Sequence, residues 1–252
     1  MAAATAESSL WVRRLRASAG PLRLVCFPHA GGAATYYAPL ANALHESIDV
    51  VSLQYPGRQD RLSEPCIDSV EVLADAIAPE LQGWLDGPFA LFGHSMGGIV
   101  AYEVGRRLAG QGRTPLGLYA SARRAPSTWR DEHVHRGGDR SLLREVARLA
   151  GTPSQLLDDE DVQQMMLPAL RGDYRAIETY EWQPGPPVTW PIWASIGDAD
   201  PLTTETEAAA WAVHTTAAFD LRVLPGGHFY FAARPMVLAG LVSDRLGGLR
   251  PR

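Results

Sequence analysis

The chain has 252 residues, of which 46% are hydrophobic and 20% charged, the balance of a globular protein with a large core. Its formal net charge of −5 at pH 7 argues against a broadly basic surface for nucleic acid. No stretch reaches the roughly 18 consecutive apolar residues of a membrane-spanning helix. The first residues also lack the basic and apolar regions of a secretory signal. We therefore expect one soluble, cytoplasmic domain over residues 1–252, binding neither nucleic acid nor membrane.

The two cysteines do not lie in a sequence pattern typical of disulfide pairing or metal binding. Cys26 falls in an apolar run that predicts a buried strand, and Cys66 lies far from it in the sequence. Neither belongs to a C-x-x-C pair or a cluster of cysteine and histidine. We expect no disulfide, no metal site and no bound cofactor.

Apolar runs and helical stripes alternate through the first half of the chain. This rhythm predicts an α/β fold with a mostly parallel central sheet and helices on both faces. Ligands of such sheets bind beyond the carboxyl ends of the strands. An edge strand is also expected near residues 10–15. The runs expected as buried strands are 22–27, 48–53, 88–92 and 116–120, with helices at about 36–44, 70–85 and 97–109.

The alternation stops at about residue 125 and resumes at a strand over 190–196. The intervening segment, 125–187, has helical patterns at 142–150, 161–170 and 174–180 and no convincing strand. An insertion between two strands at the carboxyl edge predicts a helical lid over the site, although plain helical packing would give the same pattern. After it we expect a helix at 205–214, a strand at 219–224 and a helix at 235–246.

A G-x-S-x-G pattern lies between an expected strand and an expected helix. It reads Gly93-His94-Ser95-Met96-Gly97 and is typical of a nucleophile elbow, in which a strained turn lifts the serine hydroxyl clear of the sheet. A glycine-rich loop that merely contains a serine is the alternative. The flanking strand and helix favour the elbow, so Ser95 is the predicted nucleophile.

A serine hydroxyl needs a base within hydrogen-bond reach, and the base needs an orienting carboxylate. His228 follows the strand at 219–224 and a Gly-Gly turn, and Asp200 follows the strand at 190–196. Their order after Ser95 is the order of α/β serine hydrolases, nucleophile, acid, histidine. Asp198 lies in the same loop as Asp200 and is the rival for the acid.

The reaction also needs backbone donors for an oxyanion. The Met96 amide lies at the start of the elbow helix, where unpaired N–H groups and the helix dipole point at the ligand. We expect the second donor at Ala30, in a loop where Gly31 and Gly32 let the chain pass close to a substrate. An ordinary glycine turn is the alternative for this loop.

Six stretches together resemble the type II thioesterases of polyketide and nonribosomal peptide synthesis, stand-alone editing enzymes with the α/β-hydrolase fold. GHSMG alone is shared by many hydrolases, whereas the first two stretches combined with the last are far more specific. The stretches are CFPHAGGA at 26–33, QYPGR at 54–58, GHSMGG at 93–98, RGDY at 171–174, DP at 200–201 and GGHFYF at 226–231.

The resemblance implies a serine thioesterase, with Ser95, Asp200 and His228 as the triad and the amides of Ala30 and Met96 as the oxyanion hole. It implies acyl groups on the phosphopantetheine arm of acyl or peptidyl carrier proteins as substrates, and a lid over the acyl chamber. An acyltransferase or a general esterase would use the same triad. We expect a monomer.

Three further residues are expected to contact the substrate: His29, Met165 and Met166. Adjacent methionines suit a wall that adapts to varied acyl chains, with core packing beneath the lid as the alternative.

Carrier proteins are usually acidic, as is this chain, so docking would need a local basic or apolar patch. The candidates are Arg123 with Arg124 and Arg58 with Arg61, which follow strands at the carboxyl edge. Solvated surface charges are the alternative for both pairs.

Overall fold

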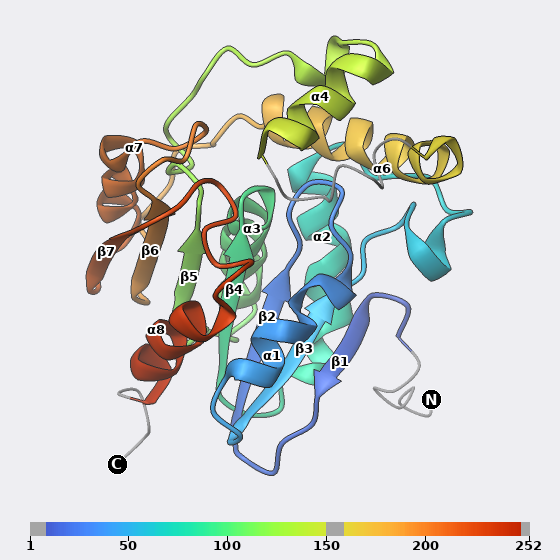
Figure 1. The fold of residues 1–252 in the computed structure, drawn as a ribbon. Helices are drawn as coiled ribbons and strands as arrows, with labels where there is room; N and C mark the ends of the chain where they lie inside the picture. The colour runs from blue at the N-terminus through green and yellow to red at the C-terminus, as the bar shows by residue number, and fades with distance from the viewer. Residues whose placement is uncertain (1–8, 150–158, 248–252) are drawn as a thin grey trace.

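The computed structural model describes residues 9–149 and 159–247. Seven strands form one sheet in the order β1-β3-β2-β4-β5-β6-β7 (Figure 1). β1 pairs antiparallel with β3, and the other neighbours pair in parallel, which confirms the predicted α/β fold. The strands are β1 (Val12–Arg16), β2 (Leu22–Phe27), β3 (Ile48–Leu53), β4 (Phe89–His94), β5 (Leu118–Ser121), β6 (Ile192–Gly197) and β7 (Phe219–Leu224).

Helices cover both faces of the sheet. α1 and α8 lie on one face and α2 and α3 on the other (Figure 1). Within the two described ranges, no helix is both long and apolar enough to cross a membrane. The helices are α1 (Ala38–Ala43), α2 (Val70–Leu81), α3 (Met96–Gly110), α4 (Asp139–Leu149), α6 (Glu160–Glu178), α7 (Glu205–Ala209) and α8 (Pro235–Gly247), with short 3-10 helices η2 (Ala34–Tyr37), η3 (Gln59–Arg61), η4 (Gln82–Trp84), η5 (Val134–Arg136) and η6 (Ala210–His214).

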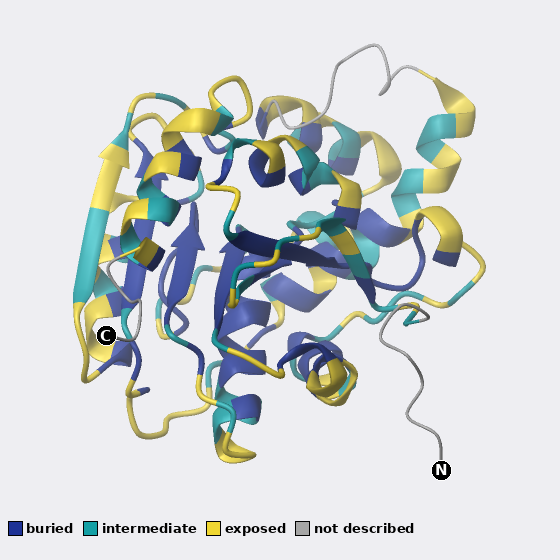
Figure 2. Ribbon diagram, turned by 90° about the horizontal axis from the view of Figure 1, so that it is seen from below, coloured by how far each residue is buried: buried dark blue, intermediate teal, exposed yellow. Residues whose placement is uncertain are grey.

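The continuous apolar run of β2 serves both faces of the sheet. Val25 and Phe27 pack into the core beneath α2 and α3, whereas Leu24 and Cys26 pack into the core beneath α1 and α8. Alternate side chains of a strand point to opposite faces, so a strand covered on both sides must be apolar throughout. The central strands are accordingly buried and the outer helix faces exposed (Figure 2).

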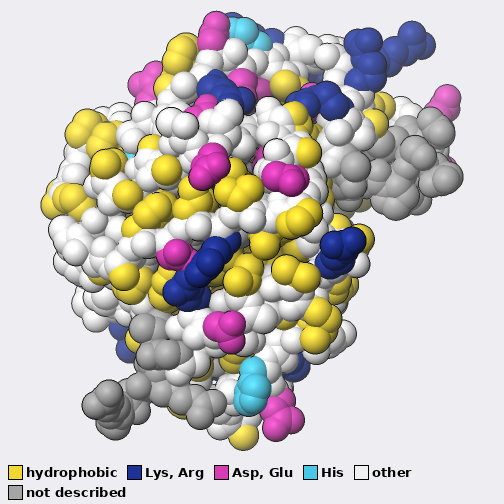
Figure 3. Space-filling model, turned by 60° about the vertical axis from the view of Figure 1, so that its left-hand side comes forward, with side chains coloured by type: hydrophobic (Ala, Val, Ile, Leu, Met, Phe, Trp, Pro, Cys, Tyr) yellow, Lys and Arg dark blue, Asp and Glu magenta, His cyan; other side chains and the backbone are white. Residues whose placement is uncertain are grey.

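The sheet ends at β7, whose residues are only partly buried. Exposed edge strands invite pairing with other chains unless charges interrupt them. Here Asp220 accepts hydrogen bonds from Arg222 and from Arg245 of α8. Figure 3 brings this side forward and shows acidic and basic side chains among the hydrophobic ones.

The segment between β5 and β6 places η5, α4 and α6 at the carboxyl edge of the sheet (Figure 1). Its described residues up to 187 contain no strand. The two helices expected at 161–170 and 174–180 form the single helix α6. Gly172 does not end the helix; a Cβ there would lie 3.0 Å from Cβ of Cys66, so this glycine permits a close approach.

Three other expected helices are split by a change of helix type. The helix expected at 70–85 consists of α2 followed by η4. The helix expected at 36–44 consists of η2 followed by α1, which has Pro39 in its first turn. The helix expected at 205–214 consists of α7, begun by a capping box at Thr204 and Glu207, followed by η6. The expected last helix corresponds to α8.

Candidate active site

Ser95 lies at the turn between β4 and α3 in a strained backbone conformation. Its φ is 54° and its ψ is −124°, where non-glycine residues are rarely found. The two glycines of the motif make this turn sterically feasible. A Cβ on Gly93 would lie 2.1 Å from the carbonyl oxygen of Gly97, and one on Gly97 would lie 2.0 Å from that of Phe27. Such strain costs about 1–3 kcal/mol and marks functional sites.

The structure brings His228 and Asp200 together. Nδ1 of His228 lies 3.0 Å from each carboxylate oxygen of Asp200, and both side chains are almost fully buried. This contact fixes the tautomer in which Nε2 is free to act as a base. Asp198 instead accepts a hydrogen bond from the Gly226 amide at 2.8 Å, which closes the loop before His228. Of the two rival carboxylates, Asp200 is therefore the one that orients the histidine.

A buried polar chain beneath the triad was not anticipated from the sequence. Nδ1 of His94 lies 3.0 Å from Oγ of Ser121, which in turn lies 2.8 Å from the hydroxyl of Tyr230. The Tyr230 hydroxyl also hydrogen-bonds Ser195 of β6. This network of hydrogen bonds connects β4, β5 and β6 to the segment that carries His228. Alternating small polar residues at strand ends, together with the tyrosine of GGHFYF, are the sequence signal that could have revealed it.

His94 and His29 lie near His228 as neutral groups. The ring of His94 lies 5.0 Å from that of His228, centroid to centroid. Burial, reinforced by His228, lowers the pKa of His94 well below its usual value. Burial likewise lowers the pKa of His29 to about 3, aided by His228 and Arg58. Two neutral rings therefore surround the base.

Ser95 and His228 line one cavity of about 310 Å³, together with Ala30, His29 and residues of the segment between β5 and β6. We call this segment, 125–187, the lid segment, after the lid predicted there. A small apolar side cavity of about 40 Å³ adjoins it at His29 and Ala30. Met166 lines this side cavity, whereas Met165 is 49% exposed and belongs to neither cavity. The structure thus brings His29 and Met166 to the site and leaves Met165 outside it.

A separate cavity of about 510 Å³ lies at the opposite edge of the sheet, between the amino end of β2 and α8. Its lining holds His45 and two hydroxyl groups, but none of the triad residues. Size alone therefore does not identify the site, and the chemistry concentrates in the smaller cavity at the carboxyl edge.

The two amides expected to form the oxyanion hole belong to residues close to Ser95: Met96 follows it directly, and Ala30 lines the same cavity. Met96 is the first residue of α3, where amides have no partner within the helix. Ala30 precedes Gly31, whose φ of +74° favours glycine. The Gly31 amide donates to Oδ2 of Asp173 at 2.7 Å. A residue of α6 therefore holds the loop that carries Ala30.

Asp173 is also the partner of Arg58. Nη1 and Nη2 of Arg58 donate to its two carboxylate oxygens at 2.7 and 2.9 Å, and Nη1 also donates to the Gly32 carbonyl. The side chain of Asp173 is 1% exposed. Burial opposes the charge of Arg58, but Asp173 outweighs it and raises the pKa of the guanidinium. This ion pair joins the loop after β3, the loop that carries Ala30, and α6 of the segment between β5 and β6, where the lid is predicted.

The four arginines considered for carrier-protein docking are buried, so the prediction of a basic patch formed by them on the surface is wrong. Arg61 is buried, donates to Glu64 and to the Gln54 carbonyl, and stacks on Trp11. Arg124 is buried and forms a two-pronged ion pair with Glu132. Arg58 and Arg123 are buried as well. Solvated surface charge does not describe these residues either, because all four arginines are buried and three of them are ion-paired. The pairs are Arg58 with Asp173, Arg61 with Glu64 and Arg124 with Glu132.

Comparison with known proteins decides the family. The sequence matches the family described as Thioesterase domain over residues 22–246. The chain belongs to this thioesterase family. It is 45% identical over 243 residues to thioesterase PikA5 of Streptomyces venezuelae, covering 95% of this chain and 86% of PikA5. It is 48% identical over 221 residues to the probable cadicidin biosynthesis thioesterase of Streptomyces griseus, covering 87% of this chain and 61% of that protein.

A solved structure supports the same assignment. The type II thioesterase BorB from the borrelidin biosynthetic cluster superposes with a TM-score of 0.89 at 44% identity, covering 95% of this chain and 98% of BorB. The resemblance to type II thioesterases is thereby confirmed, and the chain is a thioester hydrolase. The catalytic roles of the individual residues stay predictions that the geometry supports.

Proposed function

We propose that this enzyme hydrolyses acyl groups from the phosphopantetheine arm of acyl or peptidyl carrier proteins, as an editing enzyme of polyketide or nonribosomal peptide synthesis. The observation that carries the proposal is the contact of Asp200 with His228, which lines the same cavity as Ser95. The relatives support the setting, since one is named for cadicidin biosynthesis and another comes from the borrelidin biosynthetic cluster.

Catalysis proceeds through an acyl-enzyme in this proposal. Oγ of Ser95 attacks the thioester carbonyl while Nε2 of His228 accepts its proton, and Asp200 stabilises the imidazolium. The amides of Ala30 and Met96 bind the oxyanion. The C–S bond then breaks, and the departing thiolate takes the proton from His228. A water molecule, deprotonated by His228, attacks the serine ester and releases the free acid.

The experiment compares a panel of acyl groups on carrier protein and on pantetheine, with free acid as the measured product. Ser95-dependent release of free acid from acyl-carrier protein supports the proposal. Formation of an ester or amide when an alcohol or amine is added would instead indicate an acyltransferase. Faster turnover of simple esters than of acyl-carrier protein would indicate a general esterase.

A further inference from the structure

Arg123 has a charged side chain that none of the described residues pairs. The residue is 8% exposed and directly follows the end of β5. Its backbone carbonyl accepts a hydrogen bond from the Trp211 indole at 2.9 Å, which fixes the base of the side chain. Its Nε is fully buried with no hydrogen-bond partner among the described residues. Buried polar groups are nearly always satisfied, so an exception calls for an explanation.

The other charges that line the catalytic cavity already have partners. Each of these other charged groups forms a hydrogen-bonded contact, so Arg123 is the unmatched cation among the described lining residues. The contacts join Glu132 to Arg124, Arg130 to Glu207, Arg148 to Glu145, and Glu178 to the amides of Val134 and His135.

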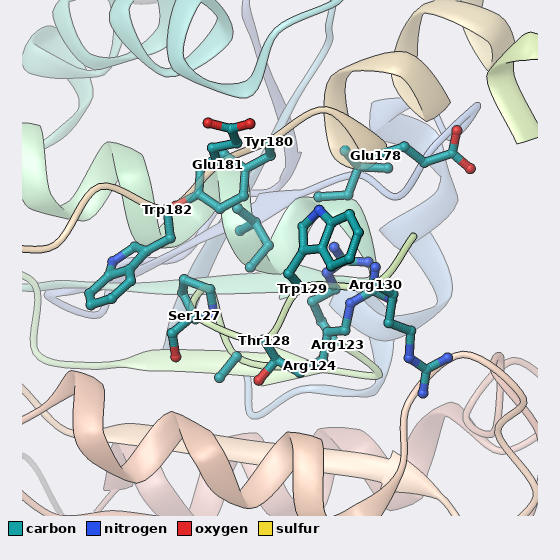
Figure 4. A pocket seen from close by; sticks show the side chains of 14 residues that line it. Arg123, Arg124, Ser127, Thr128, Trp129, Arg130, Glu178, Tyr180, Glu181 and Trp182 are labelled. Atoms are coloured by element: carbon teal, nitrogen blue, oxygen red, sulfur yellow. The ribbon is translucent and has the colours of Figure 1, made fainter. Parts of the chain in front are cut away.

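Arg123 lies where two cavities meet. It lines the catalytic cavity and also a neighbouring cavity of about 250 Å³. In the neighbouring cavity, Arg123, Arg124 and Arg130 come from the segment after β5, and Tyr180 and Trp182 come from the chain after α6 on the other side (Figure 4). A group bound at Arg123 can therefore be part of a molecule that extends from either cavity.

The pairing of β4 with β5 brings the backbone just before Arg123 next to Ser95 in space. The Ser95 amide donates to the Ser121 carbonyl at 2.8 Å, and Arg123 is two residues further on. Burial and, after it, the neighbouring Arg124 lower the pKa of Arg123 to about 9. The side chain therefore remains a cation near neutral pH. Glu132, which is ion-paired with Arg124, partly offsets the lowering of the Arg123 pKa but makes no ion-pair contact with it. A buried cation without a hydrogen-bonded counter-charge destabilises a protein, and a ligand anion in reach would relieve that cost.

We propose that Arg123 binds an anionic oxygen group of the substrate, either a carboxylate on the acyl group or the phosphate of the phosphopantetheine arm. This inference rests on the proposed thioesterase function and adds a specificity residue to it. The short path from Ser95 to Arg123 through paired strands favours the acyl carboxylate, which lies only a few bonds from the thioester.

Two matched substrate pairs separate the sources of the anion. Succinyl-pantetheine and butyryl-pantetheine have acyl groups of equal chain length that differ in one terminal carboxylate. Butyryl-phosphopantetheine and butyryl-pantetheine differ in the phosphate alone. The measured quantity is the ratio of kcat/KM within each pair. Arg123→Met removes the charge and keeps an apolar stem of similar length.

If the carboxylate is the ligand, Arg123→Met should lower the succinyl-to-butyryl ratio roughly tenfold or more, the usual effect of losing a charged hydrogen bond. If the phosphate is the ligand, the phosphorylated-to-unphosphorylated ratio should fall instead. Arg130→Met is the matched control, because it removes a cation of the same cavities that Glu207 already pairs. Its effect on either ratio should be much smaller.

A second measurement needs no variant. Free succinate should inhibit wild-type hydrolysis of butyryl-pantetheine more strongly than uncharged succinamide if the carboxylate binds, and inorganic phosphate should inhibit if the phosphate does. If Arg123→Met leaves both kcat/KM ratios unchanged, the proposal is overturned. If the variant does not fold, the inhibitors decide, and equal inhibition by all of them would overturn the proposal. Absence of Ser95-dependent butyryl hydrolysis would refute the proposed function itself, a separate outcome.

Discussion

The sheet side and the lid side of the site are held in place by different forces. On the sheet side, backbone geometry positions the chemistry: Ser95 by a strained elbow, and His228 and Asp200 by loops that follow β7 and β6. On the lid side, buried charges do so. Asp173 of α6 binds Arg58 and the Gly31 amide, and Glu178 binds two amides of η5.

This difference teaches which changes each side tolerates. Strand register and glycine turns depend little on charge, so the triad should keep its place when a surface charge is altered. A buried ion pair is strongly destabilised when one partner is removed, because the other is left uncompensated in a low dielectric. The lid side should therefore respond to single charge substitutions in stability, whereas the sheet side should respond in catalysis.

Ser95→Ala should give the largest effect and mark the sheet side as the seat of the chemistry. Removing a triad serine costs on the order of 10⁶ in kcat. The variant should keep its fold, since alanine fits the space of serine at the elbow. Steady-state kinetics and thermal unfolding measure the two expectations. A fluorophosphonate adduct on any residue other than Ser95 would contradict this assignment.

Asp200→Asn should come next, with a loss on the order of 10⁴ in kcat, because the amide favours the wrong tautomer of His228. Asp198→Asn is the matched control in the same loop. It removes a charge that binds only the Gly226 amide, and an amide oxygen can still accept that bond. The kcat values of Asp200→Asn and Asp198→Asn, measured by steady-state kinetics, should therefore differ widely. A larger loss for Asp198→Asn would reverse the assignment of the acid.

Asp173→Asn tests the lid side, and here the effect should be on stability. Leaving Arg58 buried without its counter-charge should lower the free energy of unfolding by about 3–5 kcal/mol. Asp139→Asn removes the exposed partner of Arg171 in the same segment and should cost less than about 1 kcal/mol. Urea unfolding of both variants measures the difference. Equal costs would show that burial of the Asp173 pair is unimportant.

Acid should weaken the fold through histidines that are buried as neutral groups. Burial, with a smaller effect of Arg106, lowers the pKa of His214 from its usual 6.5 to about 4. Burial, reinforced by His228 and His29, also lowers the pKa of His94 well below 6.5. At a pH between the lowered pKa of each histidine and its usual 6.5, the histidine binds a proton in the unfolded chain but not in the folded chain. Stability is therefore complete above about pH 6.5 and declines as the pH falls towards 4, by at most about 1.4 kcal/mol per pH unit for each histidine.

The comparison of unfolding at about pH 7.5 and about pH 5 tests this, because most carboxylates stay ionised throughout that range. His214→Gln should flatten the dependence, since glutamine can occupy the same polar site without titrating. A wild-type stability that is constant or higher at the lower pH would contradict the expectation.

Met166→Ala should give the smallest effect on activity, and it tests whether Met166 and Met165 have different roles. Met166 lines the apolar side cavity, so its loss should shift the preference towards longer acyl chains by a few-fold, about the value of one or two methylene groups. Met165→Ala is the control, as that side chain is largely exposed. Rates over a series of acyl lengths measure both. A uniform loss at every length, with lower thermal stability, would indicate core packing only.

Most of the sheet side could be predicted from the sequence because its signals are local, whereas the buried polar network that starts at His94 joins separate strands and was not predicted. The run of β2 shows its burial on both faces directly, and the elbow lies within five consecutive residues, 93–97. Asp200 and His228 each follow a recognisable strand. Chain order and the carboxyl-edge rule then bring them to Ser95 without knowledge of any side-chain contact.

The lid side could not be worked out in this way because its contacts are distant in the sequence. Arg58 meets Asp173 across 115 positions, and neither residue carries a local sign of burial. An arginine after a strand looks the same in sequence whether it faces solvent, as we expected, or a buried carboxylate. The same limit hid the unpaired state of Arg123, which depends on where every neighbouring carboxylate lies.

The most direct test of the central claim is intact mass spectrometry of an acyl-carrier protein mixed with this enzyme. Wild-type enzyme should return the carrier to its unacylated mass with release of the free acid, while Ser95→Ala leaves the carrier acylated. Deacylation at the same rate by the Ser95→Ala variant, or persistence of the acylated carrier with wild-type enzyme across the acyl panel, would contradict the account.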